Sequence, residues 1–137
     1  CTTINYEAFR SCSRLTTVSF PVCTSINGYA FYQCTSLKSI NFPACTTISY
    51  NAFGNCVALR SINFPACTNI GADVFRGCNN LTTVSFPACT TISNHAFYYC
   101  SNLTTVSFPA ATNIGSNVFA GCNLTSVNFP ACTIIGS

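Results

Sequence analysis

Cysteine is the residue type best suited to chemistry in this chain, with twelve copies in 137 residues. The cysteines form two series offset by 11 residues, and most neighbours within a series are 22 residues apart. Cysteines at this frequency commonly form disulfide bonds or bind zinc. The first series is Cys1, Cys23, Cys45, Cys67, Cys89 and Cys132, and the second is Cys12, Cys34, Cys56, Cys78, Cys100 and Cys122.

Neither disulfide nor zinc chemistry is expected from this spacing. Thiols that stack in register one strand spacing (~4.8 Å) apart lie within disulfide range but point in parallel, which suits the bond poorly. Ala111 stands where the first series would place a cysteine, so that position accepts any small apolar residue. The chain has no C-x2-C pair, and His95 is its one histidine, which disfavours zinc and leaves no cofactor to expect. We therefore expect mostly reduced thiols that pack as small apolar side chains.

Acid–base catalysis has few candidate residues. Glu7 and Asp73 are the only acids, and together with His95 they occupy one repeat position, which we expect to lie several coils apart on an outer surface. An active site needs a nucleophile or base with a nearby partner. No glycine-rich phosphate loop is present either. The sequence therefore predicts a protein that is not an enzyme.

A repeat of 22 residues positions all of these side chains. The stretch LTTVSFP occurs at 15–21, 81–87 and 103–109, and close variants occur at 37–43, 59–65 and 124–130. One such unit cannot bury its own apolar face, whereas stacked units cover one another. We expect residues 1–137 to form one array of about six coils that is part of a longer array. The phenylalanines that mark the period are Phe9, Phe31, Phe53, Phe75, Phe97 and Phe119.

Each unit changes its apolar period along its length. In LTTVSFP, Val84 and Phe86 alternate with polar residues, which predicts a strand that ends at the following proline. In the segment 92–100, Ile92, Ala96, Phe97 and Cys100 fit one face of a helix. This spacing predicts a short α- or 3₁₀-helical segment of about two turns.

The motif L-x-x-V-x-F-x-x-C resembles the strand signature of leucine-rich repeats. The continuation I-x-x-x-A-F-x-x-C-x-x-L resembles the BspA-like (Treponema pallidum-type) subclass, and the resemblance covers essentially the whole chain. It implies an α/β repeat fold: a right-handed leucine-rich-repeat solenoid of about six 22-residue coils, with one parallel β-sheet through the LxxVxFP segments and short helical turns on the opposite side. Members of this family are typically secreted or attached to the cell surface, and many act as adhesins or binding modules without enzymatic activity. The resemblance therefore implies an extracellular or cell-surface location.

Charge and hydropathy exclude two classes of partner. Only five basic and two acidic residues are present, giving a net charge of +3. Nucleic-acid binding needs clustered lysines and arginines, so we expect no nucleic-acid partner. No apolar run is long enough to span a bilayer.

The outward positions of the predicted strands are the candidate binding residues. They form an uncharged surface of hydroxyl and amide groups to which Lys38 and Arg60 add a local basic pair. Such a surface serves as a platform for a protein or glycan ligand, or as a merely solvated sheet face, and parallel threonine rows also suit ice binding. The candidates are Thr17, Ser19, Lys38, Ser39, Asn41, Arg60, Ser61, Asn63, Thr83, Ser85, Thr105, Ser107, Ser126 and Asn128.

A structural repeat protein that assembles into an extracellular filament or surface layer is the alternative function. Six tyrosines lie outside the predicted strands, and exposed aromatic side chains with little charge favour contact between chains. The chain begins and ends within a coil, without a polar cap, so we expect its ends to contact further repeats or copies of itself. The sequence also contains sequons at Asn80, Asn102 and Asn123, for which we prefer a structural role at a corner over glycosylation.

Overall fold

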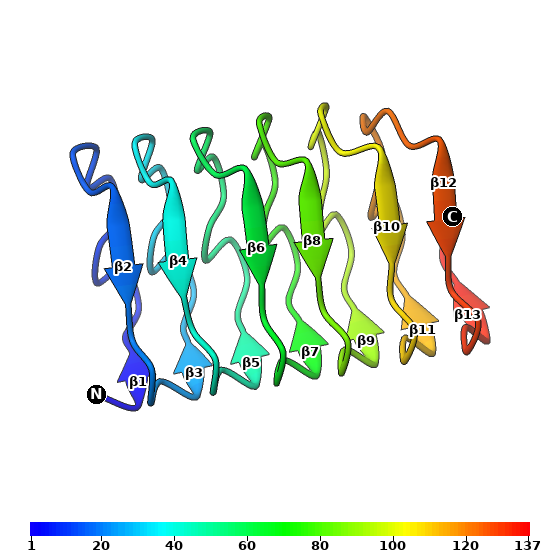
Figure 1. Cartoon of the computed structure of the whole chain (residues 1–137), viewed down its shortest axis with the longest axis horizontal. Coiled ribbons are helices and arrows are strands. Elements are labelled where there is room, and N and C mark those ends of the chain that lie inside the picture. The colour runs from blue at the N-terminus through cyan, green and yellow to red at the C-terminus, as the bar shows by residue number, and fades with distance from the viewer.

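The computed structural model describes all 137 residues as one stack of coils (Figure 1). Each coil contributes one strand to each of two rows, which run side by side along the long axis. The first row is β1 Thr3–Ile4, β3 Ser25–Ile26, β5 Thr47–Ile48, β7 Asn69–Ile70, β9 Thr91–Ile92, β11 Asn113–Ile114 and β13 Ile134–Ile135. The second row is β2 Thr17–Ser19, β4 Ser39–Asn41, β6 Ser61–Asn63, β8 Thr83–Ser85, β10 Thr105–Ser107 and β12 Ser126–Asn128.

The continuous sheet runs through the first row, where all seven strands pair in parallel in chain order. Register follows the repeat, so that Ser25 pairs with Thr47 and Asn69 with Thr91. The last pair joins Asn113 to Ile134, one residue short of the period. The residue missing between Cys122 and Leu124 is therefore absorbed at a corner without disturbing the ladder.

The second row corrects the expectation of one sheet through the LxxVxFP segments. These strands form three separate parallel pairs, β2–β4, β6–β8 and β10–β12. Each has only three residues between a corner and the phenylalanine–proline pair. Proline has no N–H for the ladder, so each strand offers few bonds to its neighbours. We name this side of the stack the strand face.

The expected helices are also wrong: residues 6–11, 28–33, 50–55, 72–77, 94–99 and 116–121 form successive tight turns instead. In the first of these turn segments, the N–H groups of Ala8, Arg10 and Cys12 donate to carbonyls three residues earlier. The intervening N–H groups donate to the next coil, as from Phe9 to the Ala30 carbonyl at 2.7 Å. Two positions per turn segment have positive φ, and ten of these twelve residues are not glycine.

Coil spacing explains why no helix forms. The phenylalanine rings of the turn segments stack with their centroids 5.1–5.7 Å apart in successive coils. The phenylalanine rings that follow the second-row strands stack with their centroids 5.4–6.0 Å apart. An α-helix with its side chains is ~10 Å across, so helices on one side would force the coils apart there. Turns that bond to the next coil keep both sides at nearly one strand spacing.

The core is one cluster of 34 buried apolar residues, and no polar side chain is buried. Two phenylalanine ladders fill its centre, and eight of their members are among the largest fully buried side chains. The inward-facing residues expected for one coil are confirmed, except that Ile40 is half-buried. The others are Leu37, Phe42, Cys45, Ile48, Phe53 and Cys56.

Candidate functional site

All fourteen candidate binding residues are exposed on the strand face. Their neighbouring strands hold some of them in contact, as where the Asn41 side-chain amide donates to the Ser19 hydroxyl at 3.0 Å. The Asn128 amide donates to the Ser107 hydroxyl at 3.3 Å in the same way. The array therefore brings these residues together as one surface, although nothing bound to it is present.

A shallow groove of about 340 Å³ crosses this surface over β4, β6 and β8. It lies across the junction at which β4 and β6 belong to different strand pairs. Six of the candidate residues line it together with Ile40, Ile62 and Val84. The six are Lys38, Ser39, Ser61, Asn63, Thr83 and Ser85.

Two of the three cations without an acidic partner lie beside this groove. Arg10 pairs with Glu7, and Arg76 pairs with Asp73 at 3.2 Å. The remaining cations are Arg14, Lys38 and Arg60, so 5 basic residues less 2 paired ones leave the whole charge of +3 on these three. Lys38 and Arg60 directly precede β4 and β6, and Arg14 lies just before β2. One end of the strand face is therefore positive.

The acids and the histidine do not form a catalytic site. Glu7, Asp73 and His95 each occupy the first positive-φ position of a turn segment. Asp73 and His95 lie in successive coils, so the expectation that all three lie several coils apart is wrong for this pair. The Asp73 carboxylate accepts a hydrogen bond from Arg76, whereas the His95 ring packs edge-on against Tyr98 at 5.3 Å. No group of three or more potential metal ligands occurs.

Eight of the twelve cysteines are buried thiols, and all twelve are unpaired in the structure. In the second series every thiol after Cys12 donates to a phenylalanine carbonyl of the preceding coil, as from Cys56 to Phe31 at 3.1 Å. In the first series the thiol donates to the carbonyl two residues ahead, as from Cys45 to Thr47 at 3.3 Å. A cysteine therefore adds a weak hydrogen bond to its apolar packing.

Burial makes these thiols poor nucleophiles. Desolvation raises the pKa of Cys34 and Cys89 to about 11 and that of Cys45 and Cys67 to about 12. It also raises the pKa of Cys78, which lies at the centre of the second series. Because the thiolate is the reactive form, the side chains in the middle of the stack are shielded from oxidation and metal binding.

We expect most of the twelve cysteines to titrate as free thiols once the chain is denatured. In the folded chain only the exposed Cys1 and Cys12 should react quickly. Titration with a chromogenic thiol reagent counts the free thiols of the denatured chain in guanidinium chloride and the reactive thiols of the folded chain without it. Six bonded pairs in the denatured chain would contradict this prediction.

Sequence reasoning missed a second threonine row. One threonine per coil lies just before each first-row strand. Its hydroxyl donates to the backbone carbonyl of the equivalent threonine in the preceding coil, as from Thr46 to Thr24 at 3.1 Å. The invariant threonine at this repeat position was the available signal. The row is Thr2, Thr24, Thr46, Thr68, Thr90, Thr112 and Thr133.

The sequon asparagines have structural partners at their corners. The side-chain amides of Asn80 and Asn123 donate to backbone carbonyls of the preceding coil at 2.8 Å, on Val57 and Ser101 respectively. The Asn102 amide donates to the Asn80 side chain at 3.4 Å. The amide nitrogen that would carry a glycan is thus already engaged, which favours the corner role.

Parallel strands, a 22-residue coil and stacked inward phenylalanines define a β-solenoid of the leucine-rich-repeat class. The family model described as BspA type Leucine rich repeat region matches six copies across residues 2–125. The chain therefore belongs to the BspA-type leucine-rich-repeat family. Repeats of this kind typically act as binding modules and not as enzymes.

Solved bacterial structures share the fold. A leucine-rich-repeat protein of T. pallidum matches with a TM-score of 0.92 and 31% identity, over 98% of this chain and 66% of that one. A leucine-rich cell surface protein of Faecalibacterium prausnitzii matches with a TM-score of 0.85 and 30% identity, over 92% of this chain and 36% of that one. A leucine-rich-repeat protein from Eubacterium ventriosum matches with a TM-score of 0.81 and 32% identity, over 88% and 34%.

The chain thus spans between about a third and two thirds of the length of these relatives. Among curated proteins it finds no match. The structure contains no helix that is long and apolar enough to cross a lipid bilayer.

Proposed function

We propose that this chain is a non-enzymatic binding or adhesion module that works outside the cell or at the cell surface and presents its strand face to a protein or glycan. The observation that carries the proposal is the concentration of exposed polar candidates and unpaired cations around one groove. Repeat arrays commonly bind ligands over such extended surfaces. The description of the F. prausnitzii relative as a cell surface protein supports the location.

The charge at the groove favours a ligand that carries acidic groups. Lys38 and Arg60 directly precede the neighbouring strands β4 and β6 and have no acidic partner. Exposed cations of this kind raise the association rate and the specificity more than the total affinity, and salt screens them. Binding should therefore weaken as the Debye length falls from ~10 Å at 0.1 M salt to ~3 Å at 1 M.

Replacing Arg60 by glutamate is expected to lower affinity for the ligand about tenfold or more, equivalent to ~1.4 kcal/mol. The ligand should first be found by applying the chain to arrays of matrix proteins and glycans, and affinity then measured by surface plasmon resonance. Arg10→Glu is the matched control, because it makes the same charge change on the turn side. An equal loss of affinity in both variants, or no loss of affinity in Arg60→Glu, would contradict the proposal that the strand face binds the ligand.

A structural repeat that assembles end to end is the second candidate function. The side chains of Ile135 and Val127 are 69% and 56% exposed. Their counterparts one coil earlier, Ile114 and Val106, are buried. A further coil, of the same polypeptide or of another molecule, would cover them. A chain with only this role binds no array component specifically, which separates the two candidates.

A further inference from the structure

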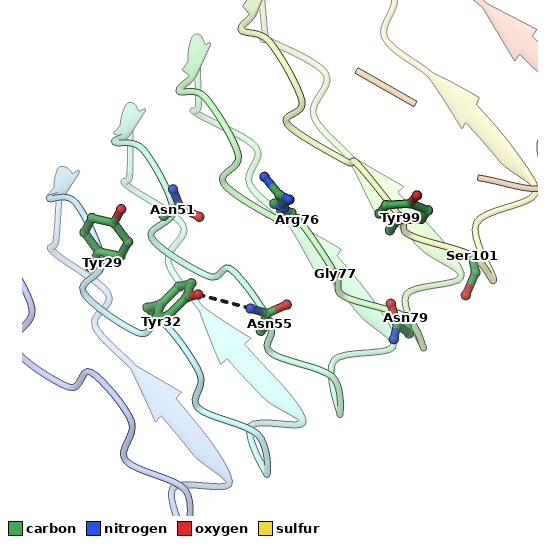
Figure 2. Close-up of a pocket in the computed structure, with 9 residues that line it drawn as sticks. All are labelled: Tyr29, Tyr32, Asn51, Asn55, Arg76, Gly77, Asn79, Tyr99 and Ser101. Atoms are coloured by element: carbon green, nitrogen blue, oxygen red, sulfur yellow. Dashed lines mark hydrogen bonds between the residues drawn. The ribbon is translucent and has the colours of Figure 1, made fainter. Parts of the chain in front are cut away.

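A second groove lies on the side of the stack formed by the turn segments, away from the strand face. Its volume is about 730 Å³, and it crosses four successive coils between Tyr29 and Tyr32 at one end and Tyr99 at the other (Figure 2). Its lining also includes Asn51, Asn55, Arg76, Gly77, Asn79 and Ser101. We name this surface the turn groove.

Glycines of the neighbouring coils fix the rings of the turn groove. A Cβ atom added to Gly54 would lie 2.9 Å from Cδ2 of Tyr32, and one added to Gly121 would lie 2.4 Å from Cδ1 of Tyr99. Each ring therefore lies close against a backbone that only glycine allows. The rings at the two ends are held in place before any ligand arrives, which reduces the entropy cost of binding.

Amide groups surround the rings and are themselves positioned. The Asn55 side-chain amide donates to the Tyr32 hydroxyl at 3.3 Å, as Figure 2 shows. Gly77, with φ of 71°, adds no side chain beside Asn55, and this keeps the middle of the groove open. Asn51 lines the same space. These amides can each donate to and accept from a ligand hydroxyl.

The turn groove has no free charge. Arg76 is its only charged lining residue, and the guanidinium group pairs with Asp73 at 3.2 Å and lies 5.1 Å from the Tyr98 ring centre. A ligand with acidic groups therefore gains less here than at Lys38 and Arg60 on the strand face. The lining offers neutral donors, neutral acceptors and aromatic faces.

We propose that the turn groove binds a neutral oligosaccharide. Aromatic faces pack against the C–H faces of sugar rings, and asparagine amides satisfy sugar hydroxyls, so both chemistries of a neutral glycan find a partner. Tyr32 and Tyr99 stand three coils apart, ~14 Å at one strand spacing per coil, which is the length of a short oligosaccharide. A protein partner would instead favour an apolar pocket for an anchoring side chain, which this polar groove lacks.

The test applies the intact chain to a neutral-glycan array and titrates it with chitotetraose and mannotetraose. The chain has six tyrosines and no tryptophan, so binding should change the tyrosine emission. Tyr99→Ala and Asn55→Ala should each lower affinity about tenfold or more. Tyr99 is 56% exposed, and its removal should leave the circular dichroism spectrum unchanged.

Two control variants separate this groove from the strand face. Val22→Ala shortens a side chain that is 59% exposed outside the groove and should leave glycan affinity unchanged, as should Arg60→Glu. Absence of binding to every neutral glycan would overturn the proposal, and so would binding that survives Tyr99→Ala. Glycan binding that is lost in Arg60→Glu would place the glycan on the strand face and leave the proposed function intact without this groove.

Discussion

Replacing Phe53 by alanine is expected to lower the free energy of unfolding by about 3–5 kcal/mol. The Phe53 ring is fully buried and stacks between Phe31 at 5.1 Å and Phe75 at 5.5 Å. It also packs against the rings of Phe42 and Phe64 in the strand-side ladder, with 6.1 Å between ring centroids in each pair. Hydrogen bonds between the coils on both sides hold the spacing, so the stack cannot close readily over the cavity.

Urea unfolding followed by circular dichroism measures this loss. Val22→Ala is the control, because its side chain is 59% exposed and its truncation should change stability by no more than ~0.5 kcal/mol. A loss for Phe53→Ala no greater than that of the control would mean that the phenylalanine ladder does not hold the coils together.

Raising the pH from about 7 to about 10 is expected to destabilise the array strongly. Desolvation raises the pKa of Cys45 and Cys67 to about 12 in the folded chain, and it also raises the pKa of Cys78. An unfolded cysteine titrates near ~8.5, so above that pH the unfolded chain binds fewer protons than the folded one. The stability contribution of these thiols is complete below ~8.5 and declines as the pH rises toward their folded pKa values.

Urea midpoints at several pH values, measured under a reductant, test this dependence. Alanine at position 111 shows that the first series accepts this substitution, so the double variant Cys45→Ala/Cys67→Ala should fold and show a shallower alkaline decline. If the urea midpoint declines equally with pH in the double variant and the parent chain, groups other than these two thiols cause the alkaline destabilisation.

The core was predictable because the repeat period is explicit. Six phenylalanines at intervals of 22 residues locate every coil, and the alternation around Val84 and Phe86 identifies the second-row strands. The apolar spacing of Ile92, Ala96, Phe97 and Cys100 fits a helix as well as the turns that occur. What decides between them is the distance between coils, a property of the stack that no single coil contains.

A local signal for the turns was nevertheless available. Asn51, Asn55, Asp73, Gly77 and Gly121 hold positive φ, and asparagine, aspartate and glycine adopt that conformation most readily. Their recurrence at two fixed positions indicates tight turns. The groove near Tyr32 and Tyr99 was not predictable, because it depends on glycines of neighbouring coils that no motif connects to the tyrosines.

Binding to an array of matrix proteins and glycans tests the central claim, that this solenoid is a binding module, most directly. The account predicts saturable binding to a small set of components, with binding to acidic ones weakened by salt and by Arg60→Glu. No specific binding to any component by the folded chain would contradict it, and would leave a structural repeat as the function.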